Sequence, residues 1–231
     1  MTGPLGVDPA DLADLPLFAG MAPADLSGLA GRLGRMALAP GCTLMSAEQP
    51  GEIAYIIQAG TLRVLLADAD GSELTLALLG AGEIVGEMAL IDDDVRSATV
   101  VAIEPVSLFW IDRATFAYYR QYVPRLVDNL TRILAQRLRR TNEQLLALAT
   151  LDVTGRVARQ LLLLAEAYGR LEADGIHIHL RLTQDDLAQL VSATRVRVNQ
   201  AIGQFKRQGI LAVDDQHRFV IRDLDALRAY L

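Results

Sequence analysis

Four residue types that suit a phosphate ester lie close together in the middle of the chain. Gly86 precedes Glu87 and Met88, and Arg96-Ser97 begins nine residues after Glu87. A glycine lets the backbone approach an anion, and the start of a short helix offers free N–H groups. An arginine can hold a phosphate through paired hydrogen bonds, and a serine adds a hydroxyl. An acid can accept a hydrogen bond from a ribose hydroxyl, as in dinucleotide sites.

Each of these residues also has an ordinary explanation, such as a turn glycine or a surface ion pair. Their combination inside a segment of short strands indicates a site for a nucleotide or a cyclic phosphate. The sequence shows no nucleophile–base pair, metal cluster or Walker loop, and its C-terminal part is too short for a kinase. We therefore do not expect an enzyme.

A second candidate site lies near the C-terminus, on two short predicted helices joined by a tight turn at residues 192–194. The first helix covers residues 183–191, and the second covers residues 195–208. Thr183 and Thr194 are their predicted N-caps, and Asp186 takes the capping-box position. A hairpin of residues 210–213 and 218–221 follows. This order is typical of a winged helix-turn-helix, which binds DNA.

The exposed face of the second helix has side chains that suit a major groove. Val198, Ala201, Ile202 and Phe205 are expected to face inward, which leaves arginine, glutamine and asparagine outward. Arginine pairs with guanine, and glutamine or asparagine with adenine, whereas Lys206, Arg207 and the hairpin's Arg218 suit phosphates. The alternative is an ordinary solvated helix. The candidate DNA contacts, with the two N-caps included, are Thr183, Thr194, Arg195, Val196, Arg197, Asn199, Gln200, Lys206, Arg207 and Arg218.

The distribution of charge favours DNA binding, although the net charge of the chain is −6. Residues 1–150 contain 11 basic and 18 acidic residues, and residues 151–231 contain 11 basic and 10 acidic residues. Residues 187–213 contain basic residues and no acid. This asymmetry predicts two domains, of which the second meets DNA.

The composition excludes several kinds of site. One cysteine, Cys42, is too few for an internal disulfide, a Cys-rich zinc site or a Cys-ligated iron–sulfur cluster. We expect Cys42 to be a small apolar filler. No run is long and apolar enough to span a membrane, and the N-terminus lacks the basic residues of a secretory signal. A cytoplasmic protein with no membrane partner is expected.

A long apolar stripe follows Pro124 at nearly heptad spacing. Such a stripe indicates either a helix packed on its own domain or a helix that pairs two subunits, and we favour self-association. Thr141 is its one polar member, which lowers dimer stability unless the hydroxyl finds a hydrogen-bond partner. The predicted seam consists of Val127, Leu130, Leu134, Leu138, Thr141, Leu145 and Leu148.

The remaining elements are predicted from local patterns. Residues 36–111 alternate short apolar runs with glycine-bearing turns, as in a sandwich or barrel, and residues 68–71 suit a hairpin turn. Residues 152–155 interrupt the long helix. Other short helices are expected at residues 11–15, 24–33, 156–168 and 224–231, and a strand is expected at residues 176–182.

Two segments carry a resemblance to a known family. The segment Gly86-Glu87-Met88-Ala89-Leu90, followed after five residues by Arg96-Ser97-Ala98-Thr99, resembles the phosphate-binding cassette of cyclic-nucleotide-binding domains. Residues 151–158 resemble the hinge and following helix of the CRP/FNR family of transcription regulators, and the helix-turn-helix lies at the matching distance. The resemblance extends from about Leu17 to Ile221.

The resemblance implies an α+β fold with three parts. Residues 1–123 would form N-terminal helices and an antiparallel β-roll with the cyclic-nucleotide-binding fold. Residues 124–151 would form a long dimerisation helix and hinge, and residues 152–231 a winged helix-turn-helix. Gly86, Glu87, Met88, Arg96 and Ser97 would hold the ribose and cyclic phosphate. Thr141 and Asn142 match a pair that contacts the adenine, one residue from each subunit, so a bound base would supply the partner that Thr141 needs.

The function that follows is that of a homodimeric, sequence-specific DNA-binding transcription regulator gated by an effector. Cyclic AMP is the expected allosteric ligand, with no prosthetic group, and a palindromic operator and RNA polymerase are the expected partners. A regulator that needs no ligand, or senses another effector, is the alternative. The choice between cyclic AMP and cyclic GMP stays open.

The sequence departs from the family pattern in two places. Asp92-Asp93-Asp94-Val95 stands where glycine and proline usually precede the arginine. These acids either compete for Arg96 or lie outward in solvent, and we expect the latter. In the recognition helix the family has Arg-Glu and a further arginine, whereas this chain has Arg195, Val196 and Gln200, so a different operator is expected.

Two branches of the family are rejected on composition. The iron–sulfur branch needs several cysteines. A haem branch needs a ligand in the β domain, whereas His177, His179 and His217 all lie in the C-terminal domain, where they are expected to be strand and hairpin residues.

We predict that Gln200→Ala relaxes selectivity at one base pair of each half-site, because glutamine pairs with adenine through its amide and alanine cannot. The expected loss is about 1–3 kcal/mol for the preferred base. Binding to a panel of single-base operator variants measures this. An equal loss of affinity for every variant would remove the proposed role.

Overall fold

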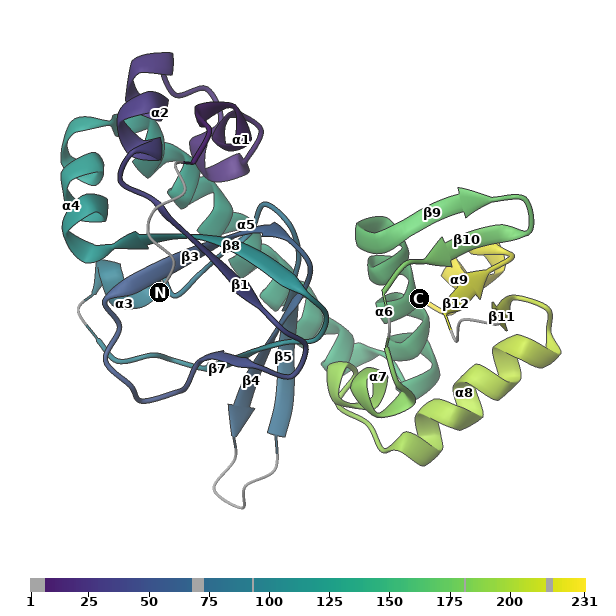
Figure 1. Ribbon diagram of the computed structural model, residues 1–231. Helices are drawn as coiled ribbons and strands as arrows, with labels where there is room; N and C mark the ends of the chain where they lie inside the picture. The colour runs from purple at the N-terminus through teal and green to yellow at the C-terminus, as the bar shows by residue number, and fades with distance from the viewer. Residues whose placement is uncertain (1–6, 68–72, 93, 181, 215–217) are drawn as a thin grey trace. The chain divides into compact units, whose positions relative to one another are not determined.

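The computed structural model describes residues 7–67, 73–92, 94–180, 182–214 and 218–231 (Figure 1). The chain divides into two compact units. The first contains residues 1–72 and 76–139, and the second contains residues 73–75 and 140–231. The predicted hairpin turn at residues 68–71, Asp93, and the tip of the C-terminal hairpin with His217 lie outside the described residues.

Two four-stranded sheets form the first unit, with strand orders β1-β8-β3-β6 and β2-β7-β4-β5. The pairs β1–β8, β3–β8, β3–β6, β2–β7 and β4–β7 are antiparallel. The antiparallel β fold inferred from the family resemblance is therefore confirmed. The strands are β1 (Gly34–Leu38), β2 (Thr43–Met45), β3 (Ile53–Ala59), β4 (Leu62–Ala67), β5 (Glu73–Leu79), β6 (Ile84–Val85), β7 (Thr99–Ala102) and β8 (Val106–Asp112).

The alternation of side chains along the central strands separates two hydrophobic cores. Ile57 and Leu108 belong to a cluster that takes side chains from strands of both sheets, such as Leu62 and Val100. Their sequence neighbours Ile56 and Phe109 belong to a different cluster. Successive side chains of a strand point to opposite faces, so each central strand contributes to both cores.

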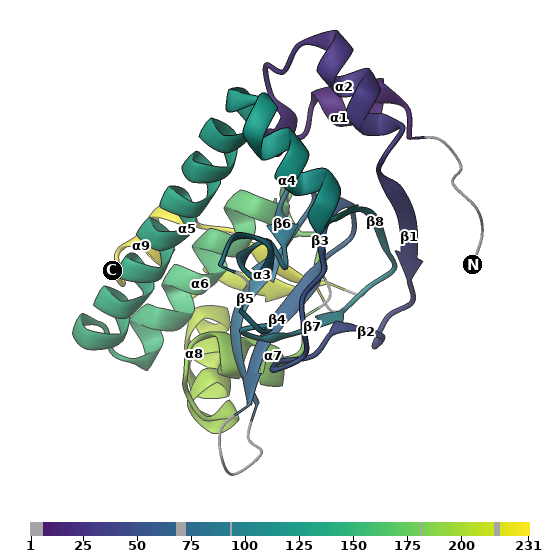
Figure 2. The ribbon, with the colours of Figure 1, turned by 90° about the vertical axis from the view of Figure 1, so that its left-hand side faces the viewer.

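Helices cover the outer face of the β1-β8-β3-β6 sheet (Figures 1 and 2). Phe18, Phe116 and Leu126 pack there against Ile56 and Phe109 from the sheet. Fully burying such side chains contributes about 1.5–3 kcal/mol each. The helical elements of this part are α1 (Pro9–Ala13), η1 (Pro16–Phe18), α2 (Pro23–Ala30), α3 (Met88–Ile91), α4 (Arg113–Tyr122) and α5 (Pro124–Thr150).

The long helix α5 begins at Pro124 and runs for 27 residues. Proline is common at the first helical position because the N–H that it lacks would have no partner within the helix. The first turns of α5 pack inward. Asn129 is buried, and its amide donates to the carbonyl oxygens of Leu17 (3.0 Å) and Ala19 (2.9 Å). These bonds tie α5 to the N-terminal helices.

The predicted seam on α5 does not form one continuous exposed stripe. Leu130 is 6% exposed and lies in the core of its own unit, with Leu134 packed against it, whereas Leu138 is 62% exposed. Two successive spacings of four residues carry the stripe about 80° around the axis between Leu130 and Leu138, at 100° per residue. Leu130 and Leu134 therefore fit the alternative of a helix packed on its own domain, whereas Val127 and Leu138 are exposed. The exposed apolar residues of α5 are Val127, Leu138, Leu145, Leu146 and Leu148.

The second unit contains a helix-turn-helix and a four-stranded sheet of order β11-β12-β10-β9. Asp152 caps its first helix by accepting from the N–H of Gly155 at 2.8 Å. Residues 153–155 are therefore the first turn of a helix, and the break from α5 lies at residues 151 and 152. The elements are α6 (Val153–Tyr168), β9 (Gly169–Glu172), β10 (Gly175–Ile178), α7 (Gln184–Leu190), α8 (Arg195–Arg207), β11 (Leu211–Val213), β12 (Phe219–Ile221) and α9 (Leu224–Arg228).

Several predicted elements differ from those observed. Helix α4 and strands β1, β2 and β9 were not predicted. Strand β10 ends at Ile178 rather than at residue 182, and α9 ends at Arg228 rather than at Leu231. No helix in the described ranges is both long and apolar enough to cross a bilayer.

Candidate functional site

The loop between β6 and α3 is built around a glycine. Gly86 has φ +81°, and a Cβ there would lie 2.4 Å from Nη1 of Arg96 and 3.1 Å from the carbonyl oxygen of Ile53. A side chain at this position would strain the backbone and displace the Arg96 guanidinium. The glycine therefore allows the arginine to come directly beneath the loop.

Arg96 is a buried cation held by backbone oxygens. Its side chain donates from Nη1 to Gly86 O (2.8 Å) and from Nη2 to Ile53 O (2.5 Å), and the residue is 7% exposed. Within the described residues no carboxylate forms an ion pair with it. Burial lowers the pKa of its guanidinium, although arginine stays charged in proteins. A buried charge without a paired counterion is costly, so this geometry favours a bound anion.

Glu87 follows the glycine and is almost completely buried, at 1% exposed. Its Oε1 accepts from Nη1 of Arg137 at 2.7 Å, and Nη2 of Arg137 donates to the carbonyl oxygen of Ile84 at 2.7 Å. The ion pair joins the loop to α5. The sequence did not predict Arg137 as a residue of this site. An arginine one residue before the exposed Leu138 was the available signal.

A second arginine, at the start of α4, stabilises the same loop through hydrogen bonds. Arg113 Nη2 donates to Gly51 O (2.7 Å) and Ala89 O (2.8 Å), and its Nε donates to Glu52 (3.0 Å). A Cβ on Gly51 would lie 2.4 Å from that of Ala89 and 3.0 Å from the Arg96 guanidinium. The segment before β3 and helix α3 thus close around Arg96. Sequence reasoning did not identify Arg113 or Gly51 as part of the site.

The acids beside the loop face solvent. Asp92 and Asp94 are exposed, and their carboxylates accept from the backbone N–H groups of Asp94 (3.3 Å) and Val95 (2.8 Å). The expectation that these two lie outward, rather than competing for Arg96, is confirmed. Asp93 between them lies outside the described residues.

The predicted ligand residues of the first unit therefore come together. Ser97 is exposed, and its hydroxyl lies 3.8 Å from the sulfur of Met88, which is 49% exposed. Thr141 and Asn142 are exposed on α5, one helical turn beyond Arg137. They belong to the second unit.

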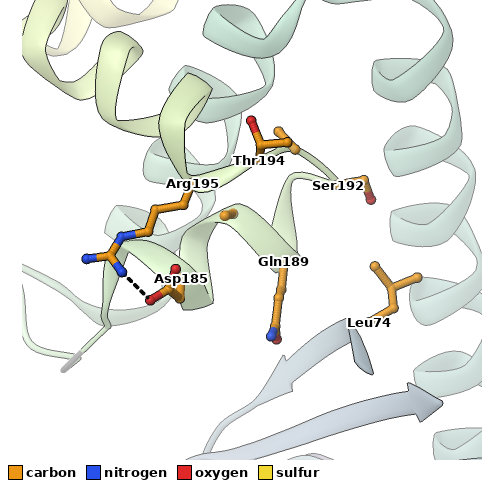
Figure 3. A pocket seen from close by; sticks show the side chains of 8 residues that line it. Leu74, Asp185, Gln189, Ser192, Thr194 and Arg195 are labelled. Carbon is orange, nitrogen blue, oxygen red and sulfur yellow. Dashed lines mark hydrogen bonds and ion pairs between the residues drawn. The ribbon is translucent and has the colours of Figure 1, made fainter. Parts of the chain in front are cut away.

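Both helices of the helix-turn-helix begin at the predicted N-cap residues. Thr183 and Asp186 form the capping box of α7, with distances of 3.1 Å and 2.8 Å. Thr194 caps α8 by accepting from the N–H of Arg197 at 3.4 Å. Asp185 and Gln189 on α7 and Ser192, Thr194 and Arg195 beside the turn line a shallow hollow (Figure 3).

Helix α8 has the two faces that the sequence predicts. Val198, Ala201, Ile202 and Phe205 are each at most 2% exposed, whereas Val196 is 66% exposed. Arg195 forms an ion pair with Asp185 at 3.1 Å, and both side chains remain more than half exposed. The other exposed candidates on this helix are Arg197, Asn199, Gln200, Lys206 and Arg207.

Arg218, which the sequence assigns to a DNA phosphate, already has two partners within its own unit. Its Nε donates to Asp214 at 2.7 Å and its Nη1 to Nδ1 of His179 at 2.9 Å, and its side chain is only 20% exposed. The guanidinium is held because a carboxylate four residues earlier faces it across the hairpin.

The expectation for Cys42 is wrong, because this residue is exposed rather than a filler of the core. It lies in a turn before β2. In the described ranges no three or more His, Cys, Asp or Glu side chains are grouped to hold a metal ion.

Each of the two units matches the profile of a known domain family. The family profile described as "Cyclic nucleotide-binding domain" matches residues 35–121, and the profile "Crp-like helix-turn-helix domain" matches residues 155–230. The chain is 34% identical over 203 residues to a protein of Mycobacterium tuberculosis named "CRP-like cAMP-activated global transcriptional regulator". That match covers 88% of this chain and 91% of the relative.

Solved structures of low identity share the fold. FixK2 from Bradyrhizobium japonicum aligns with a TM-score of 0.76 at 21% identity, over 86% of this chain and 96% of FixK2. The regulator CLP of Xanthomonas campestris, described as c-di-GMP responsive, aligns with a TM-score of 0.72 at 24% identity. That alignment covers 83% of this chain and 95% of CLP.

Removal of the Arg137 side chain should leave the buried Glu87 carboxylate without this ion pair. We predict that Arg137→Met lowers the free energy of unfolding by about 3 kcal/mol, because breaking a buried pair leaves one charge uncompensated. The double variant Arg137→Met/Glu87→Gln should recover much of that loss. Urea unfolding measures both, with Arg139→Met on the exposed face of α5 as the matched control. Equal costs for Arg137→Met and Arg139→Met would contradict a stabilising pair.

Proposed function

Because the chain belongs to the CRP/FNR family of transcription regulators, we propose that it is a homodimer whose sequence-specific DNA binding is controlled by cyclic AMP. It is a DNA-binding transcription regulator with a cyclic nucleotide-binding domain, and not an enzyme. The effector, the dimer and the residue roles are the proposal.

The observation that carries the proposal is the buried guanidinium of Arg96. Its two hydrogen bonds to Gly86 O and Ile53 O fix it in place without neutralising its charge. A cyclic phosphate carries one negative charge and oxygens that accept charge-assisted hydrogen bonds. With Arg96 below and the N–H groups of the Gly86 loop beside it, the phosphate would find a preorganised pocket, and Ser97 would add its hydroxyl.

Cyclic AMP is favoured over other effectors by two considerations. The Mycobacterium tuberculosis relative is named as cAMP-activated. Glu87 would in addition accept a hydrogen bond from the ribose 2′-hydroxyl while it keeps Arg137. The second candidate is control by another effector or by none, since the fold is shared with a regulator described as c-di-GMP responsive.

Helix α5 would pair two subunits through its exposed apolar residues. Leu138, Leu145 and Leu148 are 62%, 60% and 38% exposed in the single chain. These side chains fall at heptad spacings and suit a two-stranded coiled coil. Leu130 and Leu134 would contribute less, because they already pack in their own unit. Thr141 and Asn142 would then lie at the seam, where they could hydrogen-bond to an adenine.

DNA would be read by α8 of each subunit. Arg195 and Gln200 would contact base edges, Val196 a thymine methyl, and Lys206 and Arg207 the phosphates. Arg197 and Asn199 flank this face, and Thr183 and Thr194 would act chiefly as caps. Two recognition helices in a dimer require half-sites about one helical turn apart, hence a palindromic operator. RNA polymerase is the proposed partner at promoters.

Cyclic AMP would act by favouring the dimer geometry that fits the operator. A ligand shifts such an equilibrium only by its difference in affinity for the two states. The break between α5 and α6, at Leu151-Asp152, would be the hinge.

We predict that calorimetry detects cyclic AMP binding to the full chain and that Arg96→Ala weakens it about 100-fold or more. Two hydrogen bonds to a charged group contribute about 1.5–3 kcal/mol each, and 1.4 kcal/mol is tenfold in affinity. Arg35→Ala removes an arginine of the same unit whose ion pair with Asp11 is exposed, and should leave binding unchanged.

The competing outcomes of this calorimetry are distinct. Heat with cyclic GMP and none with cyclic AMP would change the ligand and keep the site. An absence of heat from the wild-type chain with either nucleotide would remove cyclic-nucleotide control and leave the second candidate.

We predict that Leu138→Glu and Leu145→Glu shift the chain from dimer to monomer in sedimentation equilibrium. Each leucine buried at a dimer seam contributes about 1.5–3 kcal/mol per subunit, and glutamates would face each other there. Leu171→Glu replaces a leucine that is 84% exposed on β9 and serves as the control. A wild-type chain that is monomeric at micromolar concentration, or dimers unaffected by both seam variants, would contradict this interface.

A further inference from the structure

Two hairpins of the second unit are joined by a cluster of ionisable side chains. Strands β10 and β12 pair antiparallel, with Ile176 opposite Ile221 and His177 opposite Val220, so the β9–β10 hairpin lies beside the β11–β12 wing (Figure 1). The members of this cluster, here called the wing cluster, are Glu172, Asp174, His177, His179, Asp214 and Arg218.

His177 stands at the centre of the wing cluster. Its side chain is 8% exposed, and its Nε2 lies 2.7 Å from Oδ1 of Asp174 and 3.8 Å from Oε2 of Glu172. On the other side of the ring, Nδ1 lies 3.5 Å from Oδ2 of Asp214. Carboxylates of both hairpins therefore face both ring nitrogens of one buried imidazole.

This arrangement favours the protonated ring. A neutral imidazole has one N–H and one lone pair, so one nitrogen would point a lone pair at a carboxylate. The imidazolium hydrogen-bonds to Asp174 through Nε2 and turns a second N–H toward Asp214, where Nδ1 has no other hydrogen-bond partner among the described residues. Its charge lowers the repulsion between the two carboxylates. The hydrogen bond to Asp174 raises the pKa of His177, with Glu172 and Asp214 acting in the same direction and burial opposing them.

His179 lies between Arg218 and Glu172. Its Nδ1 lies 2.9 Å from Nη1 of Arg218, and since arginine has no acceptor, Nδ1 must accept. Its Nε2 then carries the hydrogen and donates to Glu172 at 2.9 Å. His179 thus links Arg218 to Glu172 within the cluster, and the proposal concerns the proton on His177 alone.

Other charged groups bear on the cluster from the neighbouring strands. Arg170 of β9 is opposite His177 in the register. The hydrogen bond from His177 lowers the pKa of Asp174, and Arg222, just after β12, acts in the same direction. The cluster itself holds three carboxylates against one guanidinium. Protonation of His177 reduces this net negative charge on the domain that must approach a polyanion.

We propose that His177 is a positioning residue of the DNA-binding wing. Its imidazolium bridges Asp174 of the β9–β10 hairpin to Asp214 at the end of β11. Asp214 also holds Arg218, so the bridge shares that carboxylate between two cations and leaves more of the Arg218 charge for a DNA phosphate. DNA binding is stronger when the bridge carries its proton, and binding takes up a proton where the free protein has lost it.

The direction with pH follows from the sign of the shift. A histidine whose pKa is raised in the folded state contributes its stabilisation at low pH and loses it as pH rises through the folded pKa. The proposal therefore places the loss of DNA affinity above pH 6.5, the ordinary value for histidine. It rests on DNA binding by the helix-turn-helix and not on the identity of the effector.

Fluorescence anisotropy of a DNA duplex selected by the full chain from a random pool tests this at constant ionic strength, between about pH 6 and 8.5, on either side of the ordinary histidine pKa. The selection and the titration are done with and without cyclic AMP, so a failed effector does not affect the result. Wild-type affinity should fall at least about fivefold with rising pH, the lower end of ordinary coupling between sites. His177→Gln should bind with little dependence on pH. Arg218→Ala should also flatten the profile and reduce the salt slope by about one.

Two matched variants guard against a purely structural effect. Asp174→Asn removes the 2.7 Å partner of His177, and Asp225→Asn removes a carboxylate of the same unit that lies outside the cluster and is 92% exposed. Asp174→Asn should weaken the pH dependence, and Asp225→Asn should keep it. If thermal unfolding shows that His177→Gln does not fold, the comparison of Asp174→Asn with Asp225→Asn tests the proposal instead.

Several results would overturn the proposal. They are a wild-type affinity independent of pH over this range, a His177→Gln profile equal to that of the wild type, or equal profiles for Asp174→Asn and Asp225→Asn. A side-chain NMR titration in which His177 loses its proton below pH 6.5 would also exclude the bridge.

Discussion

The ligand-binding unit is organised around one buried guanidinium that is held but not neutralised. Arg96 reaches the carbonyl oxygens of Gly86 and Ile53, and it can do so only because glycine stands at 86 and 51. Carbonyl dipoles fix the cation in place, whereas a carboxylate would cancel its charge. The cost of burying this charge is best offset by an anion that arrives from outside. The short strand β6 and helix α3 flank the Arg96 guanidinium. Arg113 of α4 holds the surrounding backbone in place through its hydrogen bonds to Gly51 O and Ala89 O.

A second buried charge connects this position to the long helix. Glu87 belongs to the same loop as Gly86, yet its partner Arg137 lies on α5. A ligand that contacts Glu87 would alter a contact of α5, which is the helix proposed to pair the two subunits. A buried ion pair is weak evidence for stability, but its geometry is strict. A ligand that shares Glu87 with Arg137 can therefore favour one placement of the helix over another, which is the requirement for a population shift.

The sequence predicted those parts of both sites that depend on local chemistry. The capping box of Thr183 and Asp186, the two faces of α8 and the need for glycine at 86 are properties of a few neighbouring residues. Long-range partners were missed. Arg137 meets Glu87 across 50 residues, Arg113 meets Gly51 across 62, and neither spacing has a local signature. Strands β1 and β2 and helix α4 were missed because their patterns are short and tertiary packing decides them. The seam on α5 was predicted as one stripe, although spacing alone cannot tell which half packs on its own domain. The partners of Arg218, Asp214 and His179, were not predicted, because they depend on the pairing of the two hairpins.

We propose that cyclic AMP binding and DNA binding are one coupled equilibrium. The most direct test measures both affinities of the full chain, each with and without the other ligand, in one buffer at one salt concentration. Linkage requires that the factor by which cyclic AMP raises operator affinity equals the factor by which operator raises cyclic AMP affinity. We predict equal factors of at least about fivefold, the lower end of ordinary allosteric coupling. Tight binding of cyclic AMP with both factors equal to one would contradict this coupling.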